Sequence, residues 1–378
     1  MFNKMIYFSL KKMKYILLFY FAMFCYQNNF AQRFNLIIGS YNSPNSEGIN
    51  LYSFNDSNGT AKKISEAKSS NASFLAISKN KKNVYTVNEN NKGTLTSFLL
   101  QKDSFVQLNA VLANGTNPCH IALSNNNKWI ALSNYSSGNV SLFEQPKNGI
   151  LQNATHTVQH LGKSIDTSRQ KAPHVHSAYF SEDNKRLFVA DLGIDKIFIY
   201  PINQNKKILD TIHTTVINLP AGSGPRHFTF STQEKYLYVL AEMTGKIFVY
   251  KNELNQNFVP LQTITTLPQS DSTHTAGSAD IHISPDGNFL YASNRGKYNN
   301  LAIYSINKIT GMLTYIAQQS TLGASPRNFS IHPSGNFLLA ANQKNDEVVI
   351  FKINKNTGLL TDTGNRIAVG KPVCIKWL

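Results

Sequence analysis

Alternating apolar and polar positions recur along the chain in units of about 50 residues. In each unit an apolar strand ends at a serine or histidine, a polar turn follows, and a second apolar strand begins, as in FLAISKNKKNVYTV from Phe74 and DIHISPDGNFLYAS from Asp280. The serine or histidine positions are Ser78, Ser124, Ser181, Ser231, Ser284 and His332, with separations of 46 to 57 residues. A third strand, such as GKIFVY from Gly245, and a weaker fourth segment complete each unit. Four strands in a repeat of this length are typical of a β-propeller blade.

The two ends of the chain supply complementary parts of one further unit. FNLIIGS from Phe34 and INLYSF from Ile49 have the pattern of second and third strands, and KPVCIKWL from Lys371 has the pattern of a first strand. We expect the C-terminal strand to complete the N-terminal blade, because this pairing closes the ring and leaves neither edge open. The predicted fold is therefore all-β, a seven-bladed β-propeller closed by pairing of the C-terminal strand with the N-terminal blade, over residues 32–378.

Residues 1–31 have a different pattern. Lys11, Lys12 and Lys14 stand just before the apolar run YILLFYFAMFCY from Tyr15, which is shorter than the roughly 20 residues that a membrane span requires. This arrangement is typical of a secretory signal peptide, with a cut expected after Ala31. We therefore expect a periplasmic or secreted protein without a stable membrane span after removal of the leader. The alternative is an uncleaved N-terminal anchor.

Composition and charge narrow the class of partner. Of the 378 residues, 42% are hydrophobic and 11% aromatic, which excludes a disordered chain. The formal net charge is +16, and removal of the four leader lysines lowers it to +12. The lysines are spread thinly and form no dense basic run, so we expect a small anionic or sugar lactone substrate and no nucleic acid.

Two cysteines follow the leader, Cys119 and Cys374. Neither lies in a CxxC motif, which argues against thiol redox chemistry and against a zinc ribbon. They form either a single disulfide or two buried free thiols.

The repeat also indicates which residues converge on one mouth of the ring. The start of the first strand and the end of the second lie on the same face, because the two strands are antiparallel. First-strand starts carry Cys119, His176, Arg226, Ala279 and Arg327, followed by His120, Ser177, His227, Asp280 and Asn328. Second-strand ends carry Asn88, Asn134, Asp191, Ala241, Asn294 and Asn342, followed by Glu89, Tyr135, Leu192, Glu242, Arg295 and Gln343. These columns are polar between apolar strands, so we expect a binding or catalytic site at this mouth.

Arginine is rare in this chain, yet three of its seven arginines fall in these columns. A planar guanidinium group suits recognition of a carboxylate, a phosphate or a developing oxyanion. The alternative is that these arginines pair with Glu242, Glu89 or Asp280 and tie neighbouring blades together. The substrate contacts predicted from the columns are Asn134, His227, Asp280, Asn294 and Arg327.

The PHVHS motif places His174 and His176 two residues apart on a strand, so that we expect their side chains to point the same way. Such a pair could bind a metal, with Asp280 or His227 as a further ligand. We favour a hydrogen-bonded role, because the nearby arginines would repel a divalent cation. No metal and no cofactor is expected.

Two long connections, Gly149–Pro173 and Pro268–Ala279, run from the end of one blade to the start of the next. Both are expected to overhang the same mouth. Long loops at such a position are typical of lids or of specificity elements.

Three motifs in the mouth columns resemble a known family. PHVHS, GPRH and SNRG, with the strands that follow them, resemble the seven-bladed propeller lactonases, which include propeller-type 6-phosphogluconolactonases and fungal carboxymuconate cyclases. The similarity runs through essentially the whole mature chain. The resemblance implies an active site of a His, two Arg and a Glu, which in this sequence are His174 or His176, Arg226, Glu242 and Arg295.

The resulting hypothesis is an exported carboxylic ester hydrolase that opens a sugar lactone without a metal. Arg226 and Arg295 would orient the substrate and stabilise the oxyanion, while Glu242 or a histidine of the PHVHS pair would act as general base. One alternative is a cycloisomerase that forms a lactone from a dicarboxylate. The other is a binding propeller that captures an anionic ligand without chemistry. The identity of the lactone and its phosphorylation state stay open.

Overall fold

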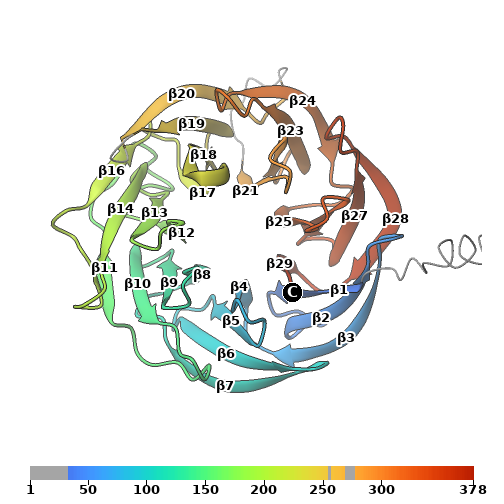
Figure 1. Ribbon diagram of the computed structural model, residues 1–378, viewed down its shortest axis with the longest axis horizontal. Helices are drawn as coiled ribbons and strands as arrows, with labels where there is room; N and C mark the ends of the chain where they lie inside the picture. Colours follow the sequence, from blue (N-terminus) through green and yellow to red (C-terminus); the bar gives the residue numbers. More distant parts are fainter. Residues whose placement is uncertain (1–32, 254–256, 269–276) are drawn as a thin grey trace, which may run out of the picture. The chain divides into compact units, whose positions relative to one another are not determined.

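Seven antiparallel β-sheets surround one axis in the computed structural model, which describes residues 33–253, 257–268 and 277–378 (Figure 1). This arrangement confirms the predicted all-β, seven-bladed propeller. The predicted signal peptide 1–31 lies outside the described residues, as do positions 269–276 of the predicted connection Pro268–Ala279. In the described parts of the chain, no helix has the length and apolar character of a membrane span.

We number the blades from the one that contains both ends of the ring. Blade 1 consists of β29 (Pro372–Trp377), β1 (Arg33–Ser40), β2 (Gly48–Asn55) and β3 (Thr60–Lys68). Blade 2 consists of β4 (Ala72–Ile77), β5 (Asn83–Asn88), β6 (Thr94–Gln101) and β7 (Ser104–Leu112), and blade 3 of β8 (Pro118–Leu123), β9 (Trp129–Asn134), β10 (Asn139–Glu144) and β11 (His156–Gln159). Blade 4 consists of β12 (Val175–Phe180), β13 (Arg186–Asp191), β14 (Lys196–Asn203), β15 (Ile208–Leu209) and β16 (Thr215–Asn218). Blade 5 consists of β17 (Pro225–Phe230), β18 (Tyr236–Ala241), β19 (Lys246–Asn252) and β20 (Phe258–Thr265), with the short 3₁₀ helix η1 (Thr232–Glu234) between β17 and β18. Blade 6 consists of β21 (Ser278–Ile283), β22 (Phe289–Asn294), β23 (Asn300–Ile306) and β24 (Leu313–Ser320), and blade 7 of β25 (Pro326–Ile331), β26 (Phe337–Asn342), β27 (Glu347–Ile353) and β28 (Leu360–Ala368).

The ring closes through the two ends of the described chain, as the sequence predicted. Strand β29 pairs antiparallel with β1, with Leu36 opposite Trp377 and Ile38 opposite Ile375. His332, which replaces the serine of the repeat in blade 7, packs against rings of blade 1, with its ring centroid 4.3 Å from that of Phe34 and 4.5 Å from that of Trp377. Pairing removes the open edges, and this packing holds the last blade against the first.

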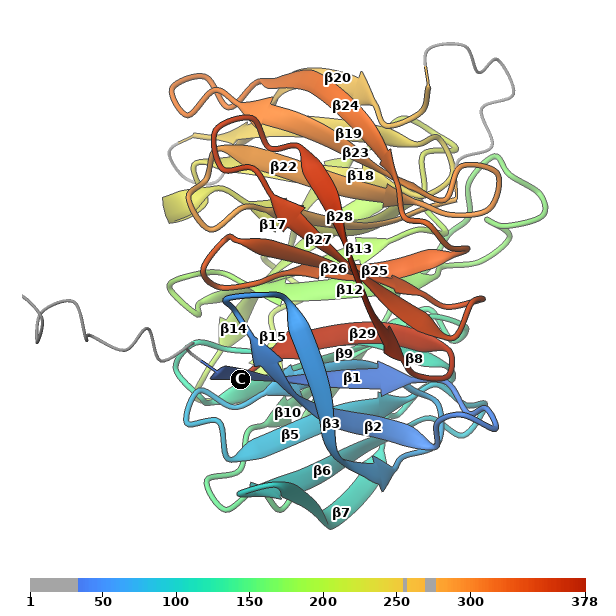
Figure 2. The ribbon, with the colours of Figure 1, turned by 90° about the vertical axis from the view of Figure 1, so that its right-hand side faces the viewer.

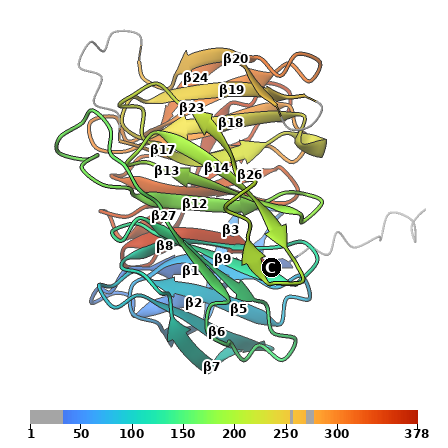
Figure 3. The same ribbon diagram turned by 90° about the vertical axis from the view of Figure 1, so that its left-hand side faces the viewer.

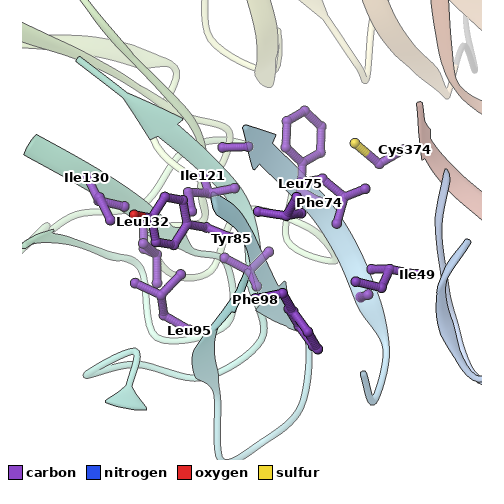
Figure 4. Close-up of a cluster of buried hydrophobic side chains, with 14 of the residues drawn as sticks. Ile49, Phe74, Leu75, Tyr85, Leu95, Phe98, Ile121, Ile130, Leu132 and Cys374 are labelled. Atoms are coloured by element: carbon purple, nitrogen blue, oxygen red, sulfur yellow. The ribbon is translucent and has the colours of Figure 1, made fainter. Parts of the chain in front are cut away.

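The hydrophobic core lies between neighbouring blades. Second strands such as β9 and β22 are buried at every position, whereas every residue of the outer strands β3 and β7 is half-buried or exposed. One cluster joins Ile49 of blade 1, Tyr85 of blade 2 and Leu132 of blade 3 (Figure 4). Side views show the connecting loops on two opposite faces of the ring (Figure 2, Figure 3). Inner strands are therefore nearly continuous apolar runs, because both of their faces pack on other blades.

The register of every first strand shifts at its second residue. A β-bulge lies there in all seven described blades, at Val373, Ser73, Cys119, His176, Arg226, the pair Ala279–Asp280, and Arg327. A bulge leaves one residue out of the hydrogen-bond ladder and turns its side chain away from the regular alternation. The bulged residues include those that the sequence predicts at the starts of the first strands, namely Cys119, His176, Arg226, Ala279 and Arg327. Their side chains therefore depart from the regular alternation of the strand.

One predicted connection has a different extent from the one expected. Strand β11 lies within Gly149–Pro173 and forms the fourth strand of blade 3, so the loop proper begins after Gln159. The four residues His156–Gln159, which pair with β10, are the weaker fourth segment that the repeat predicted for each unit. Both Cys119 and Cys374 are buried free thiols, the second of the two interpretations.

Candidate active site

Glu242 lies among three arginine side chains at the mouth of the ring. Its Oε2 is 3.0 Å from Nε of Arg226 and 2.9 Å from Nη2 of Arg295. Its Oε1 accepts a hydrogen bond from Nη2 of Arg169 at 2.8 Å. The exposed fraction of the side chain is 8% for Glu242, 2% for Arg226, 18% for Arg295 and 44% for Arg169. The three guanidinium groups thus surround the carboxylate from the floor of the site to the solvent.

The backbone of blades 5 and 6 positions two of these arginines. Arg226 occupies the bulge of β17 and donates from Nη1 to the carbonyl of Ala279 in the next blade. Arg295 directly follows β22, and its Nε donates to the carbonyl of Gly277 at 2.9 Å. The amide of Glu242 donates to the carbonyl of Gly224, two residues before Arg226, at 2.8 Å. Backbone contacts therefore fix both partners of Glu242 Oε2.

The charges of this cluster change the titration of its members. Burial alone would raise the pKa of Glu242, but the positive charges of Arg295, Arg226 and Arg169 outweigh it and hold that pKa at about 2. Burial, with the repulsion of Arg295, lowers the pKa of Arg226 to about 10. At neutral pH Glu242 is a carboxylate and Arg226 a cation.

A second ion pair lies at the same mouth. Tyr41 donates from its hydroxyl to Glu89 Oε2 at 2.6 Å, and Nη2 of Arg327 is 3.4 Å from the same oxygen. The guanidinium group of Arg327 also lies over the ring of Tyr41, 5.5 Å from its centroid. Tyr41 follows the end of β1 as Glu242 follows the end of β18, so it belongs to the same column. Tyr41 was not among the predicted mouth residues because its blade is divided between the two ends of the chain.

The two histidines of PHVHS have different surroundings. His174 stacks on Tyr135 with ring centroids 4.5 Å apart, and its Nδ1 lies 3.0 Å from the carbonyl oxygen of the same tyrosine. His176 is buried at the bulge of β12, with its Nδ1 3.8 Å from Cys119 Sγ and its ring 5.5 Å from that of Tyr135. Burial, followed by the charge of Arg226, lowers the pKa of His176 well below its usual value. His176 is therefore a neutral imidazole beside the arginines.

His227 and Asp280 form a buried pair next to His176. The His227 ring contacts that of His176 at 5.4 Å, and its Nδ1 is 2.7 Å from Asp280 Oδ1. Asp280 also receives His282 Nε2 at 2.9 Å on its other oxygen. Both predicted substrate contacts are 2% exposed and have partners in the protein. Within the described residues, no three or more His, Cys, Asp or Glu side chains are grouped so that they could hold a metal ion.

Two predicted substrate contacts are not at the mouth surface. Asn134 and Asn294 are fully buried. Asn134 donates from Nδ2 to the carbonyl of Ala113, and Asn294 donates in the same way to the carbonyl of Thr266. Each amide ties the preceding inter-blade connection to its own blade. The reason is geometric, because the last side chain of the second strand points into the blade rather than into the mouth.

Arg169 is the site residue that no repeat position indicated. It comes from the connection after β11, whose residues Ile165, Asp166 and Ser168 line a cavity of about 810 Å³ together with Glu242 and Arg295. The expectation that this connection overhangs the mouth is therefore confirmed for its second half. The sequence predicted that this connection lies at the mouth, but it did not indicate Arg169. A loop between repeats has no equivalent positions in the other units with which it could be aligned.

Comparisons with known proteins agree with this architecture. The family model described as Lactonase, 7-bladed beta-propeller matches residues 35–377. The chain is 32% identical over 349 residues to a 6-phosphogluconolactonase of Bacillus subtilis, covering 90% of this chain and 97% of the relative. It is 36% identical over 343 residues to a 6-phosphogluconolactonase of Formosa agariphila, covering 88% and 96%. The solved structure of a periplasmic gluconolactonase of Pseudomonas aeruginosa superposes with a TM-score of 0.88 at 30% identity, covering 92% of this chain and 99% of that one.

Proposed function

The chain belongs to the seven-bladed β-propeller lactonase family and is a lactone-hydrolysing carboxylic ester hydrolase, and from this premise we propose that it opens a gluconolactone-type sugar lactone at the Glu242 cluster. The observation that carries the proposal is the buried neutral His176 beside the arginines that surround Glu242. These groups provide a proton acceptor and fixed positive charges at one mouth.

Arg226 and Arg295 are the proposed electrophilic groups. Both are held by backbone carbonyls and by Glu242, so their guanidinium groups are oriented before substrate arrives. Preorganised donors of this kind stabilise the oxyanion of a tetrahedral intermediate more strongly in a buried site than in water. In this proposal Glu242 fixes the two arginines rather than accepting the proton, because a carboxylate with a pKa of about 2 is a weak base.

His176 is the proposed general base. Its imidazole is neutral at physiological pH, and its Nε2 makes no hydrogen bond within the described residues. An anionic substrate bound to the arginines would reduce their repulsion and raise the pKa of His176 towards a more effective value. His174 lies close by, but its Nδ1 is engaged by the carbonyl of Tyr135.

The chemical step balances with water as the only co-reactant. A water oxygen bonds to the lactone carbonyl carbon while His176 takes one of its protons. The carbon–oxygen bond of the ring then breaks, and the leaving alkoxide receives the proton from His176. The product is an open-chain hydroxy acid, which ionises at neutral pH. No metal is required in this scheme.

We also propose that residues 1–31 direct export. The basic residues followed by a short apolar run support this proposal, and the related Pseudomonas aeruginosa structure is named a periplasmic gluconolactonase. Mass spectrometry of the protein from the periplasm or medium would test it. A mature N-terminus near residue 32 is expected, and an intact leader on a cytoplasmic protein would contradict it.

The catalytic proposal is tested by hydrolysis of 6-phosphogluconolactone and of gluconolactone by the chain in the presence of a chelator, corrected for spontaneous opening. His176→Gln should lower kcat by about 100- to 10,000-fold, the usual effect of removing a general base. The matched control is His213→Gln, because the His213 side chain is 74% exposed and its partner among the described residues is Asp210. Full activity of His176→Gln would exclude it as the base. If the wild-type chain opens neither lactone, the proposed substrate class is wrong.

A further inference from the structure

Arg169 differs from the other arginines of the mouth in where it comes from. Arg226 and Arg327 occupy strand bulges and Arg295 follows a strand, whereas Arg169 is carried by the connection between β11 and β12. Its side chain is 44% exposed, compared with 2% for Arg226. Arg169 therefore forms the outer, solvent-facing side of the Glu242 cluster.

The connection that carries Arg169 is internally fixed. Asp166 Oδ1 accepts hydrogen bonds from the amides of Ser168 and Arg169 at 2.8 and 2.9 Å. Gln170 is fully buried and donates from Nε2 to the carbonyl of Leu192 at 2.8 Å. A turn with these contacts presents its arginine in a defined position, which lowers the entropy lost when a ligand binds.

Asp195 ties this turn to the strand of Arg226. Its carboxylate is buried and accepts hydrogen bonds from Ser164 Oγ at 2.5 Å and from Gln170 Nε2 at 2.9 Å on the loop side. On the other side it accepts from the amides of Gly222 and Gly224 at 2.8 and 2.6 Å, just before Arg226. The Asp195 carboxylate thus binds both the segment that carries Arg169 and the segment that precedes Arg226.

Arg169 has hydrogen-bond donors that the described part of the chain does not use. Its Nη2 donates to Glu242 Oε1 and to Tyr135 Oη at 2.8 and 3.1 Å. The N–H groups of Nε and Nη1 have no hydrogen-bond partner within the described residues. Among the described residues, the ion pairs at this mouth join four guanidinium groups, those of Arg169, Arg226, Arg295 and Arg327, to two carboxylates, those of Glu242 and Glu89, so the arginines outnumber the acidic side chains that they contact. A dianion such as a phosphate would compensate this excess of arginines.

We propose that Arg169 is a specificity-determining residue that binds an anionic group at the end of the substrate opposite the lactone carbonyl, and that Asp195 is its positioning residue. The proposal rests on the proposed function, which puts the carbonyl against the buried Arg226 and Arg295. The far end of a bound sugar then lies towards the open side of the cavity, where Arg169 stands. A phosphorylated sugar lactone is bound in preference to its unphosphorylated form.

The test compares the affinities of the two product acids, 6-phosphogluconate and gluconate, by calorimetry. Arg169→Gln should weaken 6-phosphogluconate about 10-fold or more relative to gluconate, the expected loss for one charge-assisted contact. Arg169→Lys should restore part of that preference, because the charge remains. Arg366→Gln is the matched control and should change neither affinity, because Arg366 lies on the outer strand β28 and pairs with Asp362.

Binding separates this inference from the proposed function. If the wild-type chain opens no lactone but prefers 6-phosphogluconate through Arg169, the proposed function fails and the inference stands. The inference is overturned if the wild type binds both acids equally, or if Arg169→Gln weakens both acids by the same factor. The second result would mean that Arg169 only supports Glu242.

The part of Asp195 is tested by combining substitutions. Asp195→Asn should reduce the same preference, and adding it to Arg169→Gln should reduce the preference no further, because both act through one turn. Ser164→Ala removes a single donor to Asp195 and provides a milder version should Asp195→Asn fail to fold. Equal and additive losses from the two residues would contradict the positioning role.

Discussion

Glu242 and Glu89 occupy the same position in two blades, yet their surroundings differ. Each directly follows the second strand of its blade and each faces an arginine from a first-strand bulge. Glu242 is 8% exposed and lies within 3.0 Å of two arginines and 2.8 Å of a third. Glu89 is 20% exposed, is 3.4 Å from Arg327 and accepts a hydrogen bond from Tyr41. The repeat determines where a carboxylate stands, while its neighbours determine what it does.

The difference has a physical origin in the number of chain segments that meet at each residue. Glu242 receives arginines from blade 5, from blade 6 and from the connection before blade 4. These charges compensate the penalty of burial, so the carboxylate stays ionised in a site shielded from water. Glu89 has one arginine and more contact with solvent, which screens its ion pair. We infer that Glu242 organises the site and that Glu89 shapes its rim.

The largest expected effect comes from Glu242→Gln. It leaves three guanidinium groups facing one another without their shared carboxylate. Breaking a buried ion pair in this way destabilises a protein by about 3–5 kcal/mol, and loss of the fixed arginines should lower kcat/KM for lactone opening by about 100-fold or more. Urea unfolding and a hydrolysis assay measure the two effects. If the unfolding free energy of Glu242→Gln lay within about 1 kcal/mol of that of the wild type, Glu242 would contribute no more to stability than is expected of Glu89.

The second prediction concerns acid. Glu242 has a pKa of about 2 in the folded chain, below its ordinary value of 4.5, so the folded state binds this proton less readily than the unfolded state. Its contribution to stability is therefore complete above about pH 4.5 and is lost as the pH falls through about 2. The shift corresponds to roughly 3 kcal/mol. The difference in unfolding free energy between wild type and Glu242→Gln should be constant from pH 7 to pH 5 and shrink below that, and a difference that grows in acid would contradict this assignment.

The smallest expected effect comes from Glu89→Gln. The amide keeps an acceptor for Tyr41, and Arg327 keeps its contact with the tyrosine ring. We expect a loss of about 1 kcal/mol or less in stability, as for a partly exposed ion pair, and less than about 10-fold in kcat/KM. Urea unfolding and the lactone hydrolysis assay measure these two effects. A loss as large as that of Glu242→Gln would mean that both carboxylates organise the site.

Much of the site could be predicted because the repeat supplies a register. Once six units are aligned, Arg226, Glu242, Arg295 and Arg327 fall in columns that must share one face. The alignment also predicted the closing strand, since a missing first strand at one end matches an unpaired one at the other. Both predictions follow from the spacing of residues along the chain, so they require no knowledge of contacts between side chains.

Other parts of the site depended on contacts between segments. Asn134 and Asn294 share a column position with mouth residues, but their amides point into the blade and bond the preceding connection. His174 and His176 are alike in sequence, but it is His176 that occupies the bulge and contacts the ring of His227. A bulge reverses the alternation on which face assignments rest, and its side chain follows the local ladder rather than the residue pattern.

By itself the sequence determined the number of blades, the closure of the ring and the columns that face the mouth, because these follow from the spacing of apolar residues along one chain. The tertiary structure alone decided the charge state of Glu242 and the presence of Arg169 beside it. Electrostatic energy depends on distances between side chains that are 16 to 73 residues apart in sequence. Those distances exist only after the blades have closed and the connection after β11 has folded against Asp195.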